Sequence, residues 1–164
     1  MTDSGIPSWM QIAKDCVGLK EIPGAKHNGV IQGWLAKLGA WWRDDETPWC
    51  GVFVAHCLRE AGLPVPQNWM RAKAWSDYGS HLRSTHVAPG AILVFSRVGG
   101  GHVGFYAGED STHFYVLGGN QGNAVTISKI AKVRCIAIRW PKGEPVIGGP
   151  KRLSLKVGTT TNEA

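Results

Sequence analysis

The sequence lacks the features of a membrane span, a secretory leader and a disulfide framework. It has no run of about 18 apolar residues, and its N-terminal segment has no basic region followed by an apolar stretch and a small-residue cleavage site. The four cysteines, Cys16, Cys50, Cys57 and Cys135, form no CxxC pair, which argues against structural zinc. We therefore expect a protein made in the cytoplasm, with free thiols and no metal or organic cofactor.

Acidic residues are also few, since 12 Asp and Glu stand against 18 Lys and Arg. The formal net charge of +6 favours an anionic partner, but the basic residues are scattered rather than aligned with aromatic residues. By charge alone, nucleic acid, teichoic acid, peptidoglycan carboxylates and anionic membranes all stay open. The acidic run of residues 44–46 precedes a predicted helix and is typical of helix stabilisation, so no pair of glycosidase carboxylates stands out.

The pattern of apolar residues divides the 164 residues into a helical first half and a second half of strands. A capping box at Ser8–Gln11 predicts a first helix, and further helices are expected over residues 29–38, 48–61 and 70–78. Short β-rich runs between turn residues predict strands over 91–95, 103–107, 113–117, 124–130 and 134–140. The sequence thus predicts one α+β domain over residues 1–140, followed by a Gly/Pro-rich basic tail over 141–164 that is partly ordered near residues 152–157.

Cys50 stands at a predicted helix start. Thr47 suits the N-cap, Pro48 suits the first helical position, and Gly62 closes the segment, so Cys50 is expected near the third helical position. Free backbone N–H groups and the helix dipole favour an anion there, which predicts a lowered thiol pKa. A role as a small core residue is the alternative for Cys50.

A second candidate is His102, which follows the glycines of residues 99–101 and opens an apolar strand. A histidine at the mouth of a strand is well placed to face a cleft, and imidazole can take a thiol proton and return it to a leaving amine. The glycine run does not form a phosphate loop, because a strand follows it and no GxxxxGK[ST] pattern is present. Cys50 and His102 therefore predict nucleophilic catalysis.

Three segments in this order, WCGVFVAHCLREAG, PGAILVFSRVGGGHVGFYAG and FYVLGGNQGNAV, resemble the CHAP group of cysteine, histidine-dependent amidohydrolases and peptidases and the related NlpC-type hydrolases, including phage lysins. The resemblance covers about residues 45–140. It implies a papain-like fold in which N-terminal helices pack on a five- to six-stranded antiparallel sheet.

The resemblance also implies roles for individual residues. Cys50 matches the nucleophile, His102 the general base, and Asn120 the polar residue that orients the imidazole. Many CHAP enzymes carry a glutamate two residues before that asparagine, where this chain has Gly118. His113 and Glu109 are the alternatives for the third residue. The turn chemistry of Asn and Gly is an equally good reason for Asn120 to stand where it does.

Eight tryptophans are many for this length, and core packing is the default for each of them. Trp49 adjoins Cys50 and is the best candidate to contact a substrate, together with Trp42 and Gln121.

The resemblance implies cleavage of a peptidoglycan amide, either the N-acetylmuramoyl-alanine bond or a peptide bond of the stem or cross-bridge. The alternatives are a catalytically silent wall-binding or phage-structural module and a thiol acyltransferase of the same fold. We expect a monomer that acts on the cell wall, not on nucleic acid. Delivery through a holin or a secretion apparatus, and an immunity protein as a further partner, are expectations as well.

Overall fold

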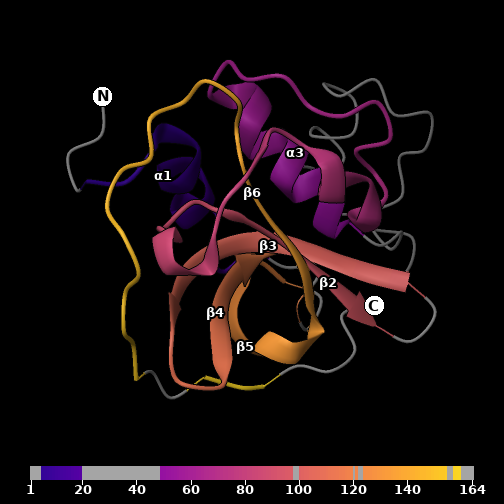
Figure 1. The fold of residues 1–164 in the computed structure, drawn as a ribbon. Coiled ribbons are helices and arrows are strands. Elements are labelled where there is room, and N and C mark those ends of the chain that lie inside the picture. The colour runs from indigo at the N-terminus through magenta and orange to yellow at the C-terminus, as the bar shows by residue number, and fades with distance from the viewer. Residues whose placement is uncertain are drawn as a thin grey trace, which may run out of the picture.

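The computed structural model of the chain describes residues 5–19, 49–97, 100–119, 121, 124–154 and 157–159. Six strands form one antiparallel sheet in the order β1-β6-β2-β3-β4-β5 (Figure 1). They are β1 Ser80–His81, β2 Ile92–Arg97, β3 Gly100–Glu109, β4 His113–Gly118, β5 Thr126–Ala131 and β6 Cys135–Trp140. The predicted α+β class and the five- to six-stranded antiparallel sheet are confirmed, and the arrangement is compatible with a papain-like fold.

The helices precede most of the sheet in the chain. Within the described residues, the α-helices are α1 Ser8–Asp15 and α3 Cys50–Glu60, and the 3-10 helices are η1 Ala72–Asp77, η2 Ser84–His86 and η3 Lys132–Arg134. The helix predicted over 70–78 is therefore the 3-10 helix η1, and the one predicted over 29–38 lies outside the described residues. Helix α1 packs against α3, and both contact β4, while α3 also packs on β3.

The predicted capping box at the start of α1 is wrong. Pro7 is the N-cap, no side chain caps the helix, and the Pro7 carbonyl accepts the N–H groups of Met10 and Gln11 at 3.0 and 3.2 Å. The Gln11 side chain instead donates to Asp15 at 3.0 Å. Proline reaches this extended N-cap backbone without strain, so the first turn begins one residue earlier than the Ser8 pattern suggests.

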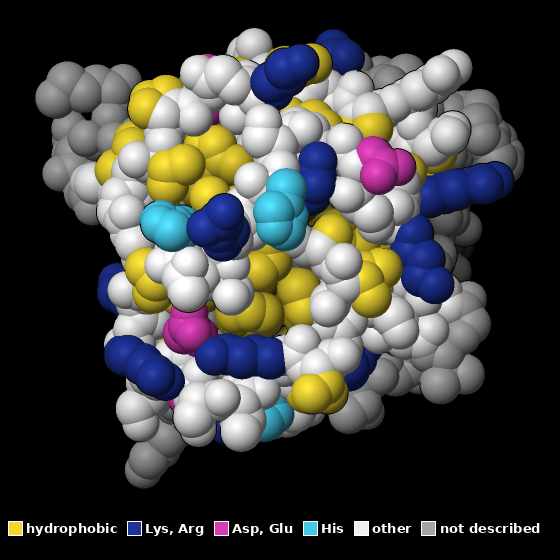
Figure 2. Space-filling model, viewed as in Figure 1, with side chains coloured by type: hydrophobic (Ala, Val, Ile, Leu, Met, Phe, Trp, Pro, Cys, Tyr) yellow, Lys and Arg dark blue, Asp and Glu magenta, His cyan; other side chains and the backbone are white. Residues whose placement is uncertain are grey.

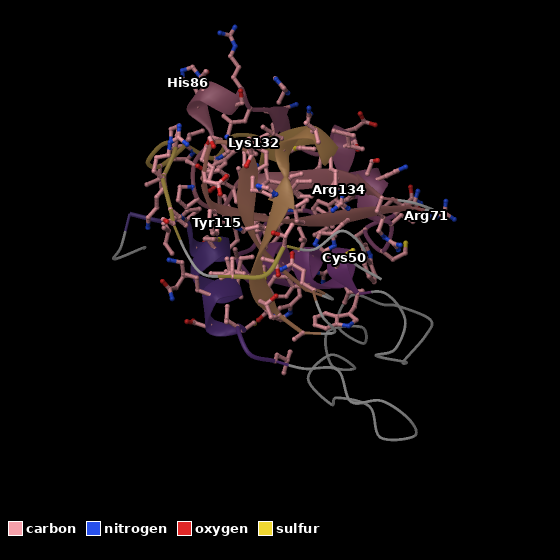
Figure 3. All side chains as sticks on the ribbon, turned by 90° about the horizontal axis from the view of Figure 1, so that it is seen from below. Cys50, Arg71, His86, Tyr115, Lys132 and Arg134 are labelled. Atoms are coloured by element: carbon pink, nitrogen blue, oxygen red, sulfur yellow. The ribbon has the colours of Figure 1, made fainter. Side chains whose placement is uncertain are left out.

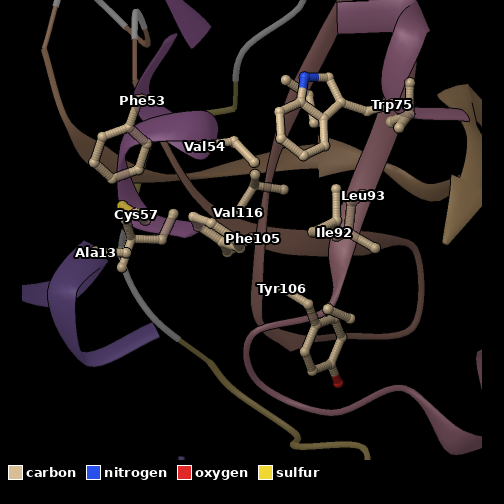
Figure 4. Close-up of a cluster of buried hydrophobic side chains, with 14 of the residues drawn as sticks. Ala13, Phe53, Val54, Cys57, Trp75, Ile92, Leu93, Phe105, Tyr106 and Val116 are labelled. Atoms are coloured by element: carbon tan, nitrogen blue, oxygen red, sulfur yellow. The ribbon is translucent and has the colours of Figure 1, made fainter. Parts of the chain in front are cut away.

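The core lies where α3 meets the sheet. Phe53 of α3 packs edge-to-face on Phe105 of β3 with ring centroids 6.1 Å apart, and both rings are fully buried. Figure 4 shows these rings with Cys57 of α3 and Ala13 of α1 in the same cluster. Burying aromatic rings of this size contributes several kcal/mol, about 3–5 kcal/mol for a truncation to alanine. The packing therefore fixes the position of α3, and with it the position of Cys50.

The start of α3 also lies directly against the segment that leads into η1. A Cβ atom at Gly51 would run into the carbonyl oxygen of Trp69 and come within 3.2 Å of the Met70 carbonyl group. The same Trp69 carbonyl accepts a hydrogen bond from the indole N–H of Trp75 at 3.0 Å. Glycine at position 51 is thus required for this close approach.

The segment after β6 returns to the sheet. The Glu109 N–H donates to the Lys151 carbonyl at 2.8 Å, the Leu153 N–H donates to the Glu109 carbonyl at 2.9 Å, and the Lys129 N–H donates to Gly158 at 2.9 Å. Gly108 makes room for the Leu153 side chain, which a Cβ at position 108 would meet.

None of the helices in the described part of the chain has the length and apolar character needed to cross a bilayer.

Candidate active site

Cys50 is the first residue of α3. Its neighbour Trp49 is the N-cap, with φ −124° and ψ 18°, and the Trp49 carbonyl accepts the Phe53 N–H at 2.9 Å. Cys50 thus lies earlier in the helix than the predicted third position, and the predicted capping residues Thr47 and Pro48 lie outside the described residues. The side chain is 5 % exposed. Figure 3 shows Cys50 at this end of α3.

Burial raises the pKa of the Cys50 thiol above its ordinary value. The backbone N–H groups of Val103, Gly51 and Cys50 itself, together with the positive charge of Arg97, act in the opposite direction and lower that pKa. The predicted net lowering is therefore wrong. Donors at the helix start do stabilise the thiolate, but loss of water around the sulfur destabilises it more.

The contact with Val103 joins the helix start to the strand that carries His102. The Val103 backbone N–H lowers the pKa of the Cys50 thiol, and Val103 directly follows His102 in β3. The two residues expected to carry the chemistry, more than 50 positions apart in the printed sequence, are therefore brought to one region of the molecule.

The His102 imidazole is fully buried and is held on two sides. Its Nε2 lies 2.9 Å from Oε1 of Gln121. Its ring stacks on Phe95, with centroids 6.4 Å apart and planes 30° apart. Phe95 of β2 is the register partner of His102 in β3, so the pairing of the strands sets this stacking. Neither contact was predicted from the sequence.

The Gln121 amide also makes hydrogen bonds to residues other than His102. Its side-chain Nε2 donates to the Val116 carbonyl at 3.1 Å, to the Thr126 carbonyl at 2.8 Å and to the Thr126 hydroxyl at 3.2 Å. The residue is 2 % exposed. Gln121 was expected to contact substrate, whereas the structure places its side chain against His102.

Gly118 leaves room for this arrangement. A Cβ atom at position 118 would lie 2.7 Å from Oε1 of Gln121 and 3.3 Å from Nε2 of His102. The position where the resemblance implied a glutamate is thus occupied by glycine, and the Gln121 amide lies in the space beside it.

Of the other residues predicted for the site, Trp49 is buried beside Cys50, whereas Glu109 and His113 have partners elsewhere and two lie outside the described part of the chain. Trp49 is 1 % exposed, and its ring packs against Gly119, where a Cβ would come within 2.7 Å. Glu109 binds Lys132 at 2.8 Å, and His113 lies 2.8 Å from the Thr112 hydroxyl. These contacts do not involve His102. Trp42 and Asn120 lie outside the described residues.

A separate hollow of about 790 Å³ lies between β6 and the segment around η2. Figure 2 shows this face, on which apolar side chains are surrounded by basic residues and histidines. Its lining includes Leu82, Arg83, Phe114, Lys132, Cys135 and Ile138, and neither Cys50 nor His102 takes part. Figure 3 likewise shows Lys132 well apart from Cys50.

Across the described ranges, no group of three His, Cys, Asp or Glu side chains could hold a metal ion.

A comparison with protein-family models tests the resemblance to the CHAP group. Residues 42–120 match the family model described as the CHAP domain. This part of the chain is therefore similar to CHAP domains. The predicted resemblance to the CHAP group is thereby confirmed, and the matched segment includes Cys50 and His102. CHAP domains are generally hydrolytic amidases or peptidases that act on peptidoglycan, so the match supports this class of activity. No relative was found among curated proteins.

The CHAP match ends at residue 120, immediately before the side chain that the structure places on the imidazole. Gln121 and its anchor Thr126 therefore lie just beyond the matched segment. The sequence offered one indication of a different arrangement, which is the glycine at position 118.

Proposed function

We propose that this protein hydrolyses an amide bond of bacterial peptidoglycan, with Cys50 as nucleophile and His102 as general base. The observation that supports this most is the packing of α3, which begins at Cys50, on β3, which carries His102, inside a CHAP match. A cysteine with N–H donors around it and a histidine nearby is the arrangement that thiol acyl transfer needs.

The reaction begins from a neutral thiol, because burial raises the pKa of Cys50. His102 takes the thiol proton as the sulfur attacks the amide carbonyl and a C–S bond forms. The developing oxyanion is stabilised by the backbone N–H of Cys50 at the helix start; loss of one such donor costs about 2.7–4 kcal/mol of barrier. His102 then protonates the leaving amine as the C–N bond breaks, and water hydrolyses the thioester to regenerate the thiol.

Asn120 stays a proposed orienting residue on the resemblance alone. Replacing it with alanine should leave residual activity, because an orienting residue improves the geometry of a base that can still accept the proton without it. Wild-type rates in Asn120→Ala would remove it from the site.

The proposed substrate is the anionic cell wall, with which the net charge of +6 is compatible. The scissile bond is either the muramoyl-alanine amide or a peptide bond of the stem or cross-bridge. We further propose that the protein reaches the wall with help, through a holin if it is a phage lysin or through a secretion apparatus, with an immunity protein as partner, if it is an effector. It would act there as a monomer, and nucleic acid would not be a partner.

The test is digestion of purified sacculi by wild-type protein, Cys50→Ala and His102→Ala, with the soluble products identified by mass spectrometry. Release of fragments by the wild type alone is expected, and the new termini identify the bond that is cut. Binding of folded wild-type protein to sacculi without release would favour a silent module. A new amide formed with an added amine would favour a transferase. Full activity in either variant would overturn the assignment of the site.

A further inference from the structure

We propose that Gln121 is a positioning residue that fixes His102 in its Nε2–H tautomer, using space left open by glycine at position 118. This inference rests on the proposed function for its catalytic meaning, since it concerns the base of that same site. The observations that carry it are the hydrogen bonds of the Gln121 amide, the stacking on Phe95 and the contacts of Gly118.

The orientation of the Gln121 amide is decided by its surroundings. Its NH2 group faces three oxygen acceptors, namely the carbonyls of Val116 and Thr126 and the hydroxyl of Thr126, at 2.8–3.2 Å. A flipped amide would turn its own oxygen toward both carbonyl oxygens, and its NH2 group toward the imidazole. In a side chain that is only 2 % exposed, such an arrangement of facing acceptors is costly. Oε1 is therefore the atom that faces His102.

This orientation decides which nitrogen of the imidazole carries the proton. Oε1 has no hydrogen to donate, so the 2.9 Å contact requires a hydrogen on Nε2 of His102. A neutral imidazole has one N–H, which makes Nδ1 the nitrogen that accepts a proton. The other tautomer would place a proton on Nδ1 and remove the base from the proposed reaction.

The chemical type of the partner matters as well. An amide is neutral, so unlike a carboxylate it gives the imidazolium no opposite charge to stabilise it. The Gln121 contact therefore orients the imidazole without placing a negative charge beside it. Phe95 holds the ring by its face while Gln121 holds it by its edge, which together fix the ring plane.

Glycine at position 118 leaves the space in which the Gln121 amide reaches His102. A Cβ there would come within 2.7 Å of Oε1, closer than side-chain atoms approach in well-packed structures, and would push the amide away from His102. Position 118 and Gln121 therefore cannot both place a side chain beside the imidazole.

The first test measures the tautomer directly by 15N NMR of the His102 ring in wild-type protein near neutral pH. The expected result is a protonated Nε2 and an unprotonated Nδ1. A protonated Nδ1 in the neutral ring would overturn the proposal. This readout needs no substrate and no variant, so it holds whether or not a variant folds.

The second test compares Gln121→Met, which keeps the length of the side chain but removes the acceptor, with Gln67→Met at an exposed position as the matched control. We expect Gln121→Met to mix the His102 tautomers and to lower kcat about tenfold or more, with KM nearly unchanged. The control should retain wild-type values. An unchanged tautomer and an unchanged kcat in folded Gln121→Met would overturn the positioning role.

Gly118→Ala tests the same geometry without removing the glutamine, and Gly149→Ala, whose Cβ would meet nothing within 4 Å, is its control. The displaced amide should shift the tautomer ratio in the same direction as Gln121→Met. A wild-type ratio in Gly118→Ala would contradict the role of position 118.

The tests separate the two proposals. Protein that leaves all sacculi intact yet shows Nε2–H in the wild type and mixed tautomers in Gln121→Met would refute the hydrolase and retain the positioning role. Active protein with Nδ1–H would refute the positioning role and retain the hydrolase.

Discussion

Cys50 combines a position that stabilises a thiolate with a burial that destabilises it. The N–H groups of Cys50, Gly51 and Val103 act on its sulfur, yet desolvation is the larger effect and the pKa is raised. A thiol that is neutral at rest and a partner histidine that faces a neutral amide are consistent with each other. Both favour proton transfer during the attack over a preformed ion pair.

The pH dependence of alkylation tests this at the level of the residue. A raised pKa means that the thiolate fraction is small near neutral pH and grows as pH rises past the ordinary value of about 8.5. Carbamidomethylation of Cys50, followed by mass spectrometry of its peptide, should therefore accelerate up to a higher pH in folded protein than in urea-unfolded protein. A rate that is flat between about pH 5 and 8 would instead indicate a thiolate–imidazolium pair.

The residues that hold His102 show what sequence reasoning can and cannot find. Cys50 and His102 carry local signals, a helix start and a glycine-rich strand mouth, and could be predicted from them. Gln121 stands in a run of Asn, Gln and Gly in the sequence that has no periodicity. Its contact with His102 depends on how β3 and β4 are placed in the sheet, which no local pattern states.

At the level of elements, helix α3 connects the core to the site. Its buried face holds Phe53 against Phe105, and its first turn lies against the Trp69–Met70 backbone. Any change that moves the first turn should therefore move the sulfur of Cys50 relative to the Val103 N–H.

Gly51→Ala is expected to destabilise the protein and lower its activity. The added methyl group would meet the backbone oxygen of Trp69, which cannot rotate away as a side chain can. Overpacking of this kind costs about 1–3 kcal/mol, and the better helix propensity of alanine returns only about 1 kcal/mol. Urea unfolding measures the difference against Gly149→Ala, which should stay within about 0.5 kcal/mol of wild type. Equal stability of the two variants would refute the close approach.

The limits of helices and strands could likewise be predicted where the sequence carries a local pattern, but not where they depend on contacts between distant segments. The long apolar runs of β2, β3 and β4 were predicted within a few positions. The two-residue strand β1 was missed, because it exists only through its pairing with Trp140 and Arg139 of β6. Helix α1 was found from its periodicity, but its cap was not, because Pro7 supplies a backbone carbonyl and no side-chain signal.

At the level of the whole molecule, the segment after β6 closes the edge of the domain. Leu153 packs on Gly108, and backbone hydrogen bonds join Lys151 and Leu153 to Glu109. Tyr106 strengthens this junction, since its hydroxyl accepts the Lys151 N–H at 2.9 Å and donates to Glu109 at 2.8 Å. The hydrogen bonds and ring contacts given above for His102 and Gln121 involve none of these tail residues.

Deleting residues 145–164 should therefore lower stability while leaving turnover in place. Three backbone hydrogen bonds at about 1 kcal/mol each, together with the packing of Leu153, suggest a loss of about 2–4 kcal/mol. Thermal unfolding of this variant is compared with deletion of 160–164, which keeps all three bonds. An unchanged melting temperature in the longer deletion would contradict the stabilising role, and lost activity in the folded variant would contradict the separation of tail and site.

Cleavage of peptidoglycan by the Cys50 thiol is best tested by following alkylation and activity in the same samples. Portions of the protein are withdrawn during treatment with iodoacetamide, and both the modified fraction of the Cys50 peptide and the rate of fragment release from sacculi are measured. We expect the remaining activity to equal the unmodified fraction of Cys50 and not to follow the modification of Cys16 or Cys135. Undiminished release of fragments after complete modification of Cys50 would contradict this expectation.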